Sequence, residues 1–240
     1  MNILILGYGK MGKTIEQIAI ARQHTIFAKI DNHNKEDLYK LKGAKIDIAI
    51  EFSQPESAYG NIKFCLENHI PVVCGTTGWL EKKPELDQIC RMNGGSFFYA
   101  SNFSVGVNLF FHFNKILARV MNHYPEYDIK MEEIHHTEKK DAPSGTAITL
   151  AEGIISQNDR KKVWVNSTAS SSEQLEIISK RIENIPGTHT IQYESKVDTL
   201  EIKHTAHTRH GFAEGAVVAA EWLKGKKGIF GMNDMLKISY

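Results

Sequence analysis

The first hundred residues alternate between short apolar runs and longer segments with apolar residues at helical spacing. Apolar runs occur at residues 3–6, 26–30, 46–52, 71–74 and 96–99. Helical spacing occurs between them, at residues 14–21, 57–67 and 80–92. Fully apolar runs predict strands that are buried on both faces, and strands that alternate with helices are typical of a parallel, doubly wound sheet.

The second half of the chain has a different pattern. A long apolar-striped helix is predicted from residue 104 to about 120, and the helical segment 146–155 follows later. Strands are predicted at residues 127–134, 163–165, 188–194 and 199–206, and a further helix at 173–182. The last two strands alternate polar and apolar residues, which indicates that one face of each is covered. Together the four strands predict a four-stranded mixed sheet.

We therefore expect an α/β protein with two domains. Residues 1–104 and 209–240 should form a dinucleotide-binding domain with a doubly wound parallel (Rossmann) sheet, closed by a small-residue helix at 215–223. Residues 105–208 should form an α+β domain that binds substrate and mediates oligomerisation. An open four-stranded sheet needs its uncovered face or edge buried, which favours self-association.

Composition narrows the functional classes. The chain has 240 residues, 42% hydrophobic content and a net charge of +1, without a basic stripe, so we expect no nucleic-acid partner. No stretch approaches the roughly twenty apolar residues of a membrane span, so no membrane partner is expected either. Three cysteines without a C-x-x-C pair indicate a reducing compartment, and we expect a cytoplasmic protein.

A glycine-rich loop follows the first predicted strand. Gly7 suits the tight turn, Gly9 the close approach of a pyrophosphate, and Gly12 the packing of the helix on the strand. Asp31 closes the second strand at the spacing expected for a ribose-binding acid. The loop between these glycines is completed by Tyr8, Lys10 and Met11.

The nicotinamide cofactor is predicted as NADH or NADPH. Asp31 can accept hydrogen bonds from both ribose hydroxyls of NADH and would repel a 2′-phosphate, whereas Lys10 and Lys35 can partly offset that repulsion. NADH is the first choice, and use of NADPH stays open. Three loops at the carboxyl ends of later strands, at residues 52–53, 75–78 and 100–103, should border the nicotinamide ring.

The loop at residues 133–146, E-I-H-H-T-E-K-K-D-A-P-S-G-T, carries the candidate chemistry. His135 and His136 can exchange protons near neutral pH, and Lys139 and Lys140 add positive charge. Ser144 can cap the following helix and leave the amides of Gly145 and Thr146 open to a carboxylate. This pattern indicates an acid/base site for a small anionic substrate; the alternative is a solvated basic turn before a capped helix.

A histidine cluster further on is not interpreted as a metal site. His204, His207 and His210 have no cysteine nearby, and a spacing of three on a strand places successive side chains on opposite faces. We expect no metal.

The loop sequence E-I-H-H-x-x-K-K-D-A-P-S-G-T-A resembles the signature of dihydrodipicolinate reductases, and the resemblance covers essentially the whole chain. Further matches are C-G-T-T-G at residues 74–78, A-x-N-F at 100–103 and R-x-x-F at 209–212. The glycine loop is one residue shorter than is common in that family.

The resemblance implies reduction of 4-hydroxy-tetrahydrodipicolinate to tetrahydrodipicolinate with NAD(P)H, on the diaminopimelate route to lysine, by a homotetramer. It implies that His135 supplies the proton and that Lys139 stabilises the developing charge. The implied substrate-binding residues are His136, Lys139, Ser144, Gly145 and Thr146. The implied cofactor-binding residues beyond the glycine loop are Gly75, Thr76, Thr77, Ala100, Ser101, Asn102, Phe103, Arg209 and Phe212.

Two other functions stay open at this point. One is a different nicotinamide oxidoreductase that acts on another carboxylic acid, such as aspartate. The other is a nucleotide-sensing protein without turnover, for which the residues from His135 to Lys140 would be superfluous.

Overall fold

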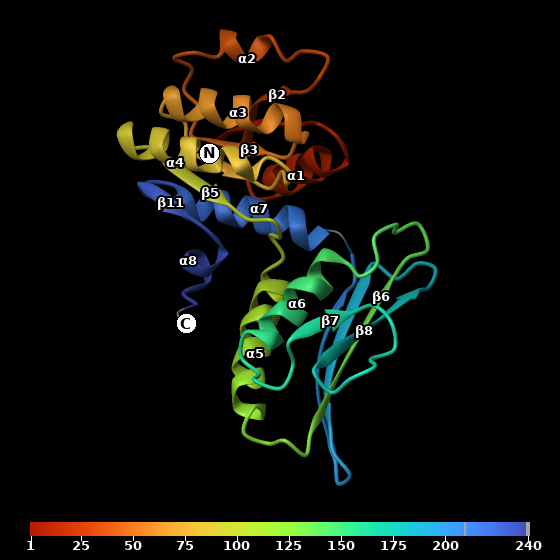
Figure 1. The fold of residues 1–240 in the computed structure, drawn as a ribbon. Coiled ribbons are helices and arrows are strands. Elements are labelled where there is room, and N and C mark those ends of the chain that lie inside the picture. Colours follow the sequence, from red (N-terminus) through yellow and green to blue (C-terminus); the bar gives the residue numbers. More distant parts are fainter. Residues whose placement is uncertain (209, 239–240) are drawn as a thin grey trace. The chain divides into compact units, whose positions relative to one another are not determined.

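The structure, a computed structural model, describes residues 1–208 and 210–238 and divides into two compact units. The first unit comprises Met1–Val105 and His210–Tyr240, and the second comprises Gly106–Arg209. The chain leaves the first unit in helix α5 (Val105–Met121) and re-enters it in α7 (His210–Leu223), as Figure 1 shows. The first unit is therefore built from two separate segments of sequence.

The first unit contains a six-stranded parallel sheet with the order β11-β5-β4-β3-β1-β2. Its strands are β1 (Asn2–Leu6), β2 (Thr25–Ile30), β3 (Ile48–Glu51), β4 (Val72–Cys74), β5 (Ser96–Tyr99) and β11 (Gly228–Phe230). Its other helices are α1 (Lys10–Ala21), α2 (Asp37–Lys40), α3 (Pro55–Glu67), the 3-10 turn η1 (Leu80–Lys82), α4 (Lys83–Met92) and α8 (Met232–Leu236). The strand order reverses between β1 and β3, and such a reversal opens a ligand crevice at the carboxyl ends of the strands.

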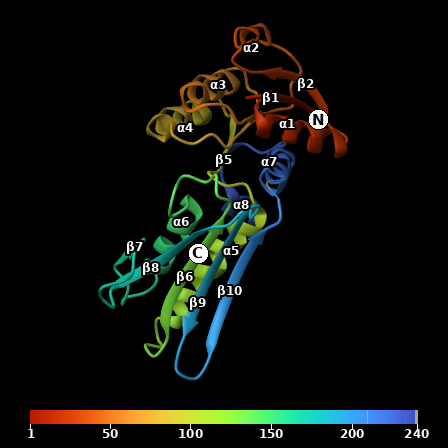
Figure 2. The ribbon, with the colours of Figure 1, turned by 90° about the vertical axis from the view of Figure 1, so that its right-hand side faces the viewer.

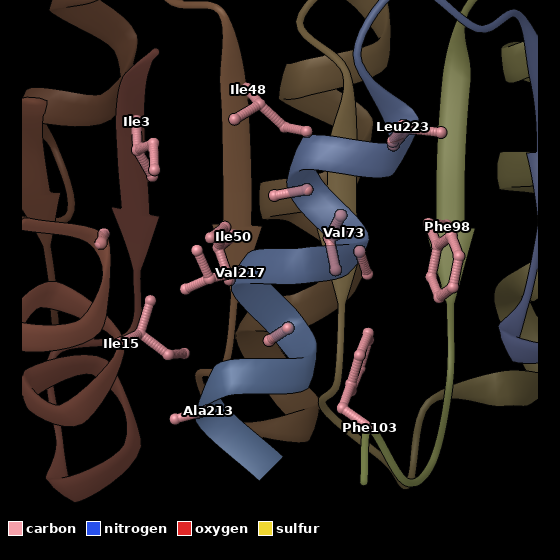
Figure 3. Close-up of a cluster of buried hydrophobic side chains, with 14 of the residues drawn as sticks. Ile3, Ile15, Ile48, Ile50, Val73, Phe98, Phe103, Ala213, Val217 and Leu223 are labelled. Atoms are coloured by element: carbon pink, nitrogen blue, oxygen red, sulfur yellow. The ribbon is translucent and has the colours of Figure 1, made fainter. Parts of the chain in front are cut away.

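Both faces of this sheet are buried, which explains the continuous apolar runs. Along β1, Ile3 and Ile5 face a cluster that includes α1 and α7, whereas Leu4 and Leu6 face a cluster that includes α3 and α4. Figure 3 shows the first of these clusters, where Ile50, Val73 and Phe98 come from three neighbouring strands and Val217 comes from α7. Small residues let α7 approach closely: a Cβ on Gly215 would lie 1.8 Å from the carbonyl oxygen of Phe103.

The second unit contains a five-stranded mixed sheet with the order β10-β9-β6-β8-β7. Its strands are β6 (Asp128–His135), β7 (Val163–Val165), β8 (Gln174–Arg181), β9 (Gly187–Glu194) and β10 (Thr199–Ala206). Helices α5 and α6 (Gly145–Ile155) pack on one face of this sheet, and Figure 2 shows α5 behind the long strands β6, β9 and β10. Tyr193 and Ile191 of β9 are fully buried in that core.

The helix predicted at residues 173–182 is wrong, because this segment forms strand β8. Leu175, Ile178 and Ile182 are spaced as on one face of a helix, but only Leu175 among these three joins the core. In the structure Leu175 and Ile177 point into the core, while Ile178 is 40% exposed on the opposite face. Parallel pairing with β6 decides the conformation, and no local pattern reports that pairing. The predicted four-stranded sheet therefore has five strands.

The predicted fold class is confirmed, since a parallel sheet covered by helices is joined to a second, mixed sheet. Strand β11 and helices α2 and α8 were not predicted; each has five residues or fewer. Among the helices of residues 1–208 and 210–238, none is both long enough and apolar enough to cross a membrane.

Candidate active site

Two of the three loop glycines are required by packing. Gly7 follows β1 with φ +94°, and a Cβ there would lie 2.1 Å from the carbonyl oxygen of Phe52. A Cβ on Gly12 would lie 2.1 Å from the carbonyl oxygen of Gly7. No side chain fits at either position, so the tight turn and the close packing of α1 both depend on glycine.

Gly9 has the opposite surroundings. A Cβ at this position would have no neighbour within 4 Å, and Gly9 is the N-cap of α1 without a side-chain hydrogen bond to the helix end. The amide end of α1 therefore lies beside open space, where the helix dipole and unpartnered N–H groups favour an anion. This arrangement fits a dinucleotide pyrophosphate.

A pocket connects the glycine loop with the end of β2. Gly7, Tyr8 and Gly9 line it together with Asp31 and residues further along the chain, among them Lys35, Phe52, Ser53, Gln54 and Asn61. The Oδ1 atom of Asp31 accepts a hydrogen bond of 2.8 Å from the amide of His33. Lys10 is exposed and lies outside this lining. The pocket brings together the predicted phosphate-binding and ribose-binding residues.

The Tyr8 ring is held in place by α1 and β2. Its hydroxyl donates to a carboxylate oxygen of Glu16, and the ammonium group of Lys29 lies 4.6 Å from the ring centroid. Lys29 also pairs with Glu16 at 3.0 Å. The ring is therefore anchored at the wall of the pocket.

The loops after β3 and β4 are tied to one another. The Oγ1 atom of Thr76 accepts from the amide of Ser53 at 2.9 Å, and a Cβ on Gly75 would lie 2.3 Å from the Phe52 ring. Met11, Gly75, Thr76 and Thr77 line a second pocket with residues 52–55. Glu51, which was not predicted as a site residue, is fully buried beneath these loops and accepts from the Ser53 amide at 3.1 Å.

The predicted residues after β5 have mixed surroundings. Ala100 and Phe103 are buried, and the Phe103 ring packs against Phe98 and Phe52 with centroid distances of 5.8 and 5.5 Å. Ser101 is exposed and Asn102 accepts from the Ser104 amide at 2.9 Å. The side chain of Phe103 is part of the core of the first unit. In α7, Phe212 is half-buried; the prediction for Arg209 lies outside the described residues.

Strand register gathers a polar cluster in the second unit. Glu133 and His135 lie two residues apart on β6 and share a face. On the flanking strands, His189 of β9 is the register partner of Glu133, and Arg181 of β8 is the register partner of His135. Glu133 is fully buried, and His135 and His189 are 7% and 5% exposed.

Glu133 is the centre of this cluster. Its Oε2 atom lies 2.6 Å from Nδ1 of His135, although the two groups are not aligned as in a good hydrogen bond. Its Oε1 atom accepts from the two Nη atoms of Arg181 at 3.2 and 3.1 Å and from the amide of Ser144 at 3.3 Å. Burial alone would raise the pKa of Glu133, but contacts with His135, Ser144 and Ser179 outweigh it and hold the pKa well below its ordinary value. The carboxylate is ionised at neutral pH.

His189 supplies a neutral imidazole to the same cluster. Burial first, and then the neighbouring His135, lower the pKa of His189 to about 4. The two rings meet edge to face with centroids 5.1 Å apart, and Nε2 of His189 lies 3.2 Å from Oγ of Ser144.

The start of α6 has the predicted cap. The Oγ atom of Ser144 accepts from the amide of Ala147 at 3.2 Å. Within the described part of the chain, the amides of Gly145 and Thr146 donate no hydrogen bond, and a Cβ on Gly145 would have no neighbour within 4 Å. This helix end can therefore accept a carboxylate.

Lys139 and His136, two further predicted site residues, lie in the loop before α6. The ammonium group of Lys139 is paired with both carboxylate oxygens of Asp141 at 2.8 Å. His136 is half-buried and lines a pocket with residues 183–186. Asp141 is exposed, so a substrate carboxylate can compete with it for Lys139.

Sequence reasoning missed Glu133, His189 and Arg181 as members of this cluster. The signal for Glu133 was available, since residues two apart on a strand share a face. His189 and Arg181 gave no such signal, because they reach His135 only through the pairing of β9 and β8 with β6.

Comparisons with known proteins confirm the resemblance found in the sequence. The family model for the N-terminus of dihydrodipicolinate reductase matches residues 1–103, and the model for the C-terminus matches residues 106–236. A 4-hydroxy-tetrahydrodipicolinate reductase of Christiangramia forsetii is 51% identical over 236 residues, which cover 98% of each chain. A 4-hydroxy-tetrahydrodipicolinate reductase of Methanoregula boonei is 32% identical and covers 95% of this chain and 94% of its own.

Solved structures share the fold. Dihydrodipicolinate reductase from Paenisporosarcina sp. TG-14, solved with dipicolinate, superposes with a TM-score of 0.80 at 22% identity and covers 98% of this chain and 99% of its own. An amine dehydrogenase from Mycobacterium smegmatis superposes with a TM-score of 0.60 at 12% identity and covers 95% of this chain and 94% of its own. At these identities the likeness concerns the fold. Because both family models match and a relative with 51% identity aligns over 98% of each chain, the chain belongs to the dihydrodipicolinate reductase family.

Proposed function

We propose that this protein reduces 4-hydroxy-tetrahydrodipicolinate to tetrahydrodipicolinate with NADH or NADPH, in the diaminopimelate route to lysine. The family assignment makes it an NAD(P)H-dependent oxidoreductase. The observation that carries the proposal for this chain's own residues is the buried cluster around His135, beside a helix end with two unpartnered amides. We assign nucleotide binding to residues 1–104 and 209–240, and substrate binding to residues 105–208.

The first unit fits a nicotinamide dinucleotide. When bound, this cofactor supplies the hydride. The open space at Gly9, the uncapped end of α1 and the carboxylate of Asp31 in one pocket suit its pyrophosphate and its ribose. Thr76 and Ser53 hold together the loops that we assign to the nicotinamide end, with Gly75 and Thr77 beside them.

The second unit supplies the proton. Loss of the 4-hydroxyl group as water turns the substrate into a conjugated imine. Hydride addition to this imine leaves a carbanion-like centre, and an acid within hydrogen-bond reach must protonate it. We assign this role to His135, because Glu133 occupies its Nδ1 side and leaves Nε2 for exchange. Lys139 stabilises the developing negative charge from the loop that follows.

The two substrate carboxylates need cationic or N–H partners. The amides of Gly145 and Thr146, with Ser144 fixed as the cap, offer one such group at the start of α6. Lys139 and His136 offer the partners for the second carboxylate. Lys139 would then give up its contact with Asp141 and bind the substrate carboxylate instead.

The oligomeric state and the compartment are also proposals. The face of the second sheet that α5 and α6 do not cover carries Ile178, which is 40% exposed, and its edge strand β10 carries Leu200, which is 41% exposed. An open sheet of this kind favours association with further copies, and we propose a homotetramer. All three cysteines are free and buried, which fits a cytoplasmic protein. Sedimentation that shows only 27.1 kDa monomers would contradict the tetramer.

One assay separates this function from its alternatives. The protein is mixed with NADH or NADPH and freshly generated 4-hydroxy-tetrahydrodipicolinate, and the absorbance of the reduced nicotinamide is followed. We expect rapid loss of absorbance with this substrate. We expect no loss with the substrate of the alternative oxidoreductase, such as the imine of aspartate. A protein that binds nucleotide in calorimetry but oxidises none of it would be a nucleotide sensor. Titration with NADH and NADPH in the same calorimeter gives the cofactor preference set by Asp31.

A further inference from the structure

We propose that Glu133 and Arg181 act as a positioning pair for His135 and Lys139. Glu133 determines which ring nitrogen of His135 carries the proton, and Arg181 ties this carboxylate to the loop that bears Lys139. The inference rests on the proposed function, because that function makes His135 the proton donor. Neither member of the pair touches the substrate in this role.

Glu133 selects the tautomer of His135. An ionised carboxylate can only accept a proton, so the neutral imidazole next to it keeps its hydrogen on Nδ1. Nδ1 is fully buried and 2.6 Å from Oε2 of Glu133. The protonated ring that acts as the acid therefore gives up its proton from Nε2 and keeps the proton on Nδ1. Glu133 has no contact with solvent, so water cannot replace it as the partner of Nδ1.

The guanidinium group of Arg181 connects Glu133 with the loop that carries Lys139. Its two Nη atoms donate to Oε1 of Glu133 at 3.2 and 3.1 Å. The Nη2 atom also donates to the carbonyl of Asp141 at 2.6 Å, and Nε donates to the carbonyl of Lys139 at 3.3 Å. A planar group with donors in fixed directions holds these acceptors in one geometry, which a lysine cannot do. The backbone that carries Lys139 is thus bound to the partner of His135.

Glu133 also contacts the residue that caps α6. The same Oε1 atom that accepts from Arg181 also accepts from the amide of Ser144 at 3.3 Å. One buried carboxylate therefore contacts the proton donor, the guanidinium that holds the lysine loop, and the cap of the helix that we assign to a substrate carboxylate. Loss of this carboxylate should disturb all three elements together.

The chain offers a matched control on the same two strands. Glu132 and Lys180 are the sequence neighbours of Glu133 and Arg181, and they form an ion pair of 2.5 Å between β6 and β8. Their side chains are 31% and 50% exposed and lie on the other face of the sheet. Glu132→Gln and Lys180→Met therefore remove a pair of the same type between the same strands without touching His135.

The first test uses the wild-type protein without substrate or cofactor. Nitrogen-15 NMR of the histidine side chains, at a pH where His135 is neutral, reports which nitrogen carries its proton, and His135→Gln assigns the signal. We expect the proton on Nδ1. A proton on Nε2 would overturn the proposal, whatever reaction the enzyme catalyses.

The second test measures turnover. We expect Glu133→Gln to lower kcat about 10- to 100-fold, with the Kd for NADH unchanged. We expect Arg181→Met to lower kcat and also raise the KM for the substrate, and Arg181→Lys to recover little of either. The double variant, which removes both charges, should lose less kcat than the product of the two single losses, because the two residues share the contact between Glu133 and Arg181. The control variants should stay within about twofold of wild type.

These outcomes distinguish a failure of the positioning role from a failure of the proposed function. Glu133→Gln with native circular dichroism and a kcat within twofold of wild type would overturn the positioning role, as would an equal loss in the control variants. Wild-type protein that reduces no substrate would contradict the proposed function instead, and the NMR result would then decide this inference alone.

Discussion

A Cβ placed on Gly187 would lie 3.0 Å from Nε2 of His135 and 3.2 Å from Cδ2 of the same ring. Gly187 begins β9, two residues before His189, so the strand that supplies the neutral histidine also supplies the surface on which the His135 ring rests. Glu133 bounds the ring at Nδ1, and Gly187 bounds it near the nitrogen that we assign to proton transfer. The ring therefore has little freedom to move.

Gly187→Ala should move the His135 ring by a few tenths of an ångström. We expect kcat to fall about tenfold, because proton transfer depends on the position of the donor. The Kd for NADH should not change, since the glycine loop lies in the other unit. The control is Gly60→Ala in the exposed middle of α3, where a Cβ has no neighbour within 4 Å. It should leave kcat unaltered and raise stability by about 0.5–1 kcal/mol. Wild-type kcat in Gly187→Ala would contradict the role of the ring position.

His135→Gln tests the proton donor directly. Glutamine keeps a polar group of similar reach but cannot donate a proton as an acid, so we expect turnover to fall by about 10²–10⁴. Cofactor affinity should stay close to that of wild type. Steady-state kinetics and NADH titration check the two parts, and an unchanged rate would end the assignment of His135.

Gly145→Pro tests the helix amide without removing the helix. Proline is well tolerated at the first position of a helix, and Ser144 already has φ −66° and ψ 153°, the extended backbone that a following proline requires. A Cβ at 145 has open space, so the ring can be accommodated. The variant loses only an N–H, and we expect the KM for the substrate to rise about tenfold at nearly unchanged stability.

Thr146→Val is the comparison for that experiment, because it removes a hydroxyl and keeps the amide. If the amides bind the carboxylate, Thr146→Val should raise the KM less than Gly145→Pro does. Neither variant should change the KM for the nucleotide. An equal rise for substrate and nucleotide would contradict separate sites in the two units.

Gly9→Ala and Gly7→Ala should separate cofactor binding from folding. Alanine at 9 meets no protein atom within 4 Å and keeps φ near −80°, so the melting temperature should not change. The added methyl group occupies the space that we assign to the pyrophosphate, and we expect the Kd for NADH to rise about tenfold. Alanine at 7 meets Phe52 and needs φ +94°, so it should destabilise the fold by more than about 1 kcal/mol. Unaltered NADH binding in Gly9→Ala would place the pyrophosphate elsewhere.

Local sequence predicted the first unit better than the second for a physical reason. In β1, residues that face opposite sides of the sheet are all apolar, so the strand is visible without knowledge of its neighbours. In β8 the apolar residues are divided between a covered and an open face, and Leu175, Ile178 and Ile182 then imitate a helix. Only the pairing with β6 shows that the segment is a strand.

The candidate site divides in the same way. The histidine pair, the lysine and the cap at Ser144 lie within one short loop, and the sequence alone predicted their chemistry. The side chain of Arg181 reaches Glu133 from 48 residues away, and Ser144 meets His189 from 45 residues away. Contacts between residues so far apart in the sequence are fixed by strand register, so they became visible only in the structure.

Acid should destabilise the second unit through His189. In the unfolded chain this histidine has a pKa near 6.5, whereas burial and His135 lower its pKa to about 4 in the folded protein. Between these values the unfolded state binds one more proton, so the stability contribution is complete above about pH 6.5 and is lost as the pH falls towards 4. From pH 7 to pH 5 the loss is about 2 kcal/mol, measured as the free energy of unfolding in urea. Glu133 has a lowered pKa, so its own contribution is lost only below about pH 4.5, outside this window.

His189→Gln should remove this loss, because glutamine does not titrate and can still meet the Ser144 hydroxyl. The difference in unfolding free energy between pH 7 and pH 5 should shrink by about 2 kcal/mol relative to wild type. His123→Gln, which replaces an exposed histidine of the same unit, should leave the difference as it is. An identical pH dependence in His189→Gln and wild type would show that His189 accepts a proton as readily when folded as when unfolded, and that it is not the neutral member of the cluster.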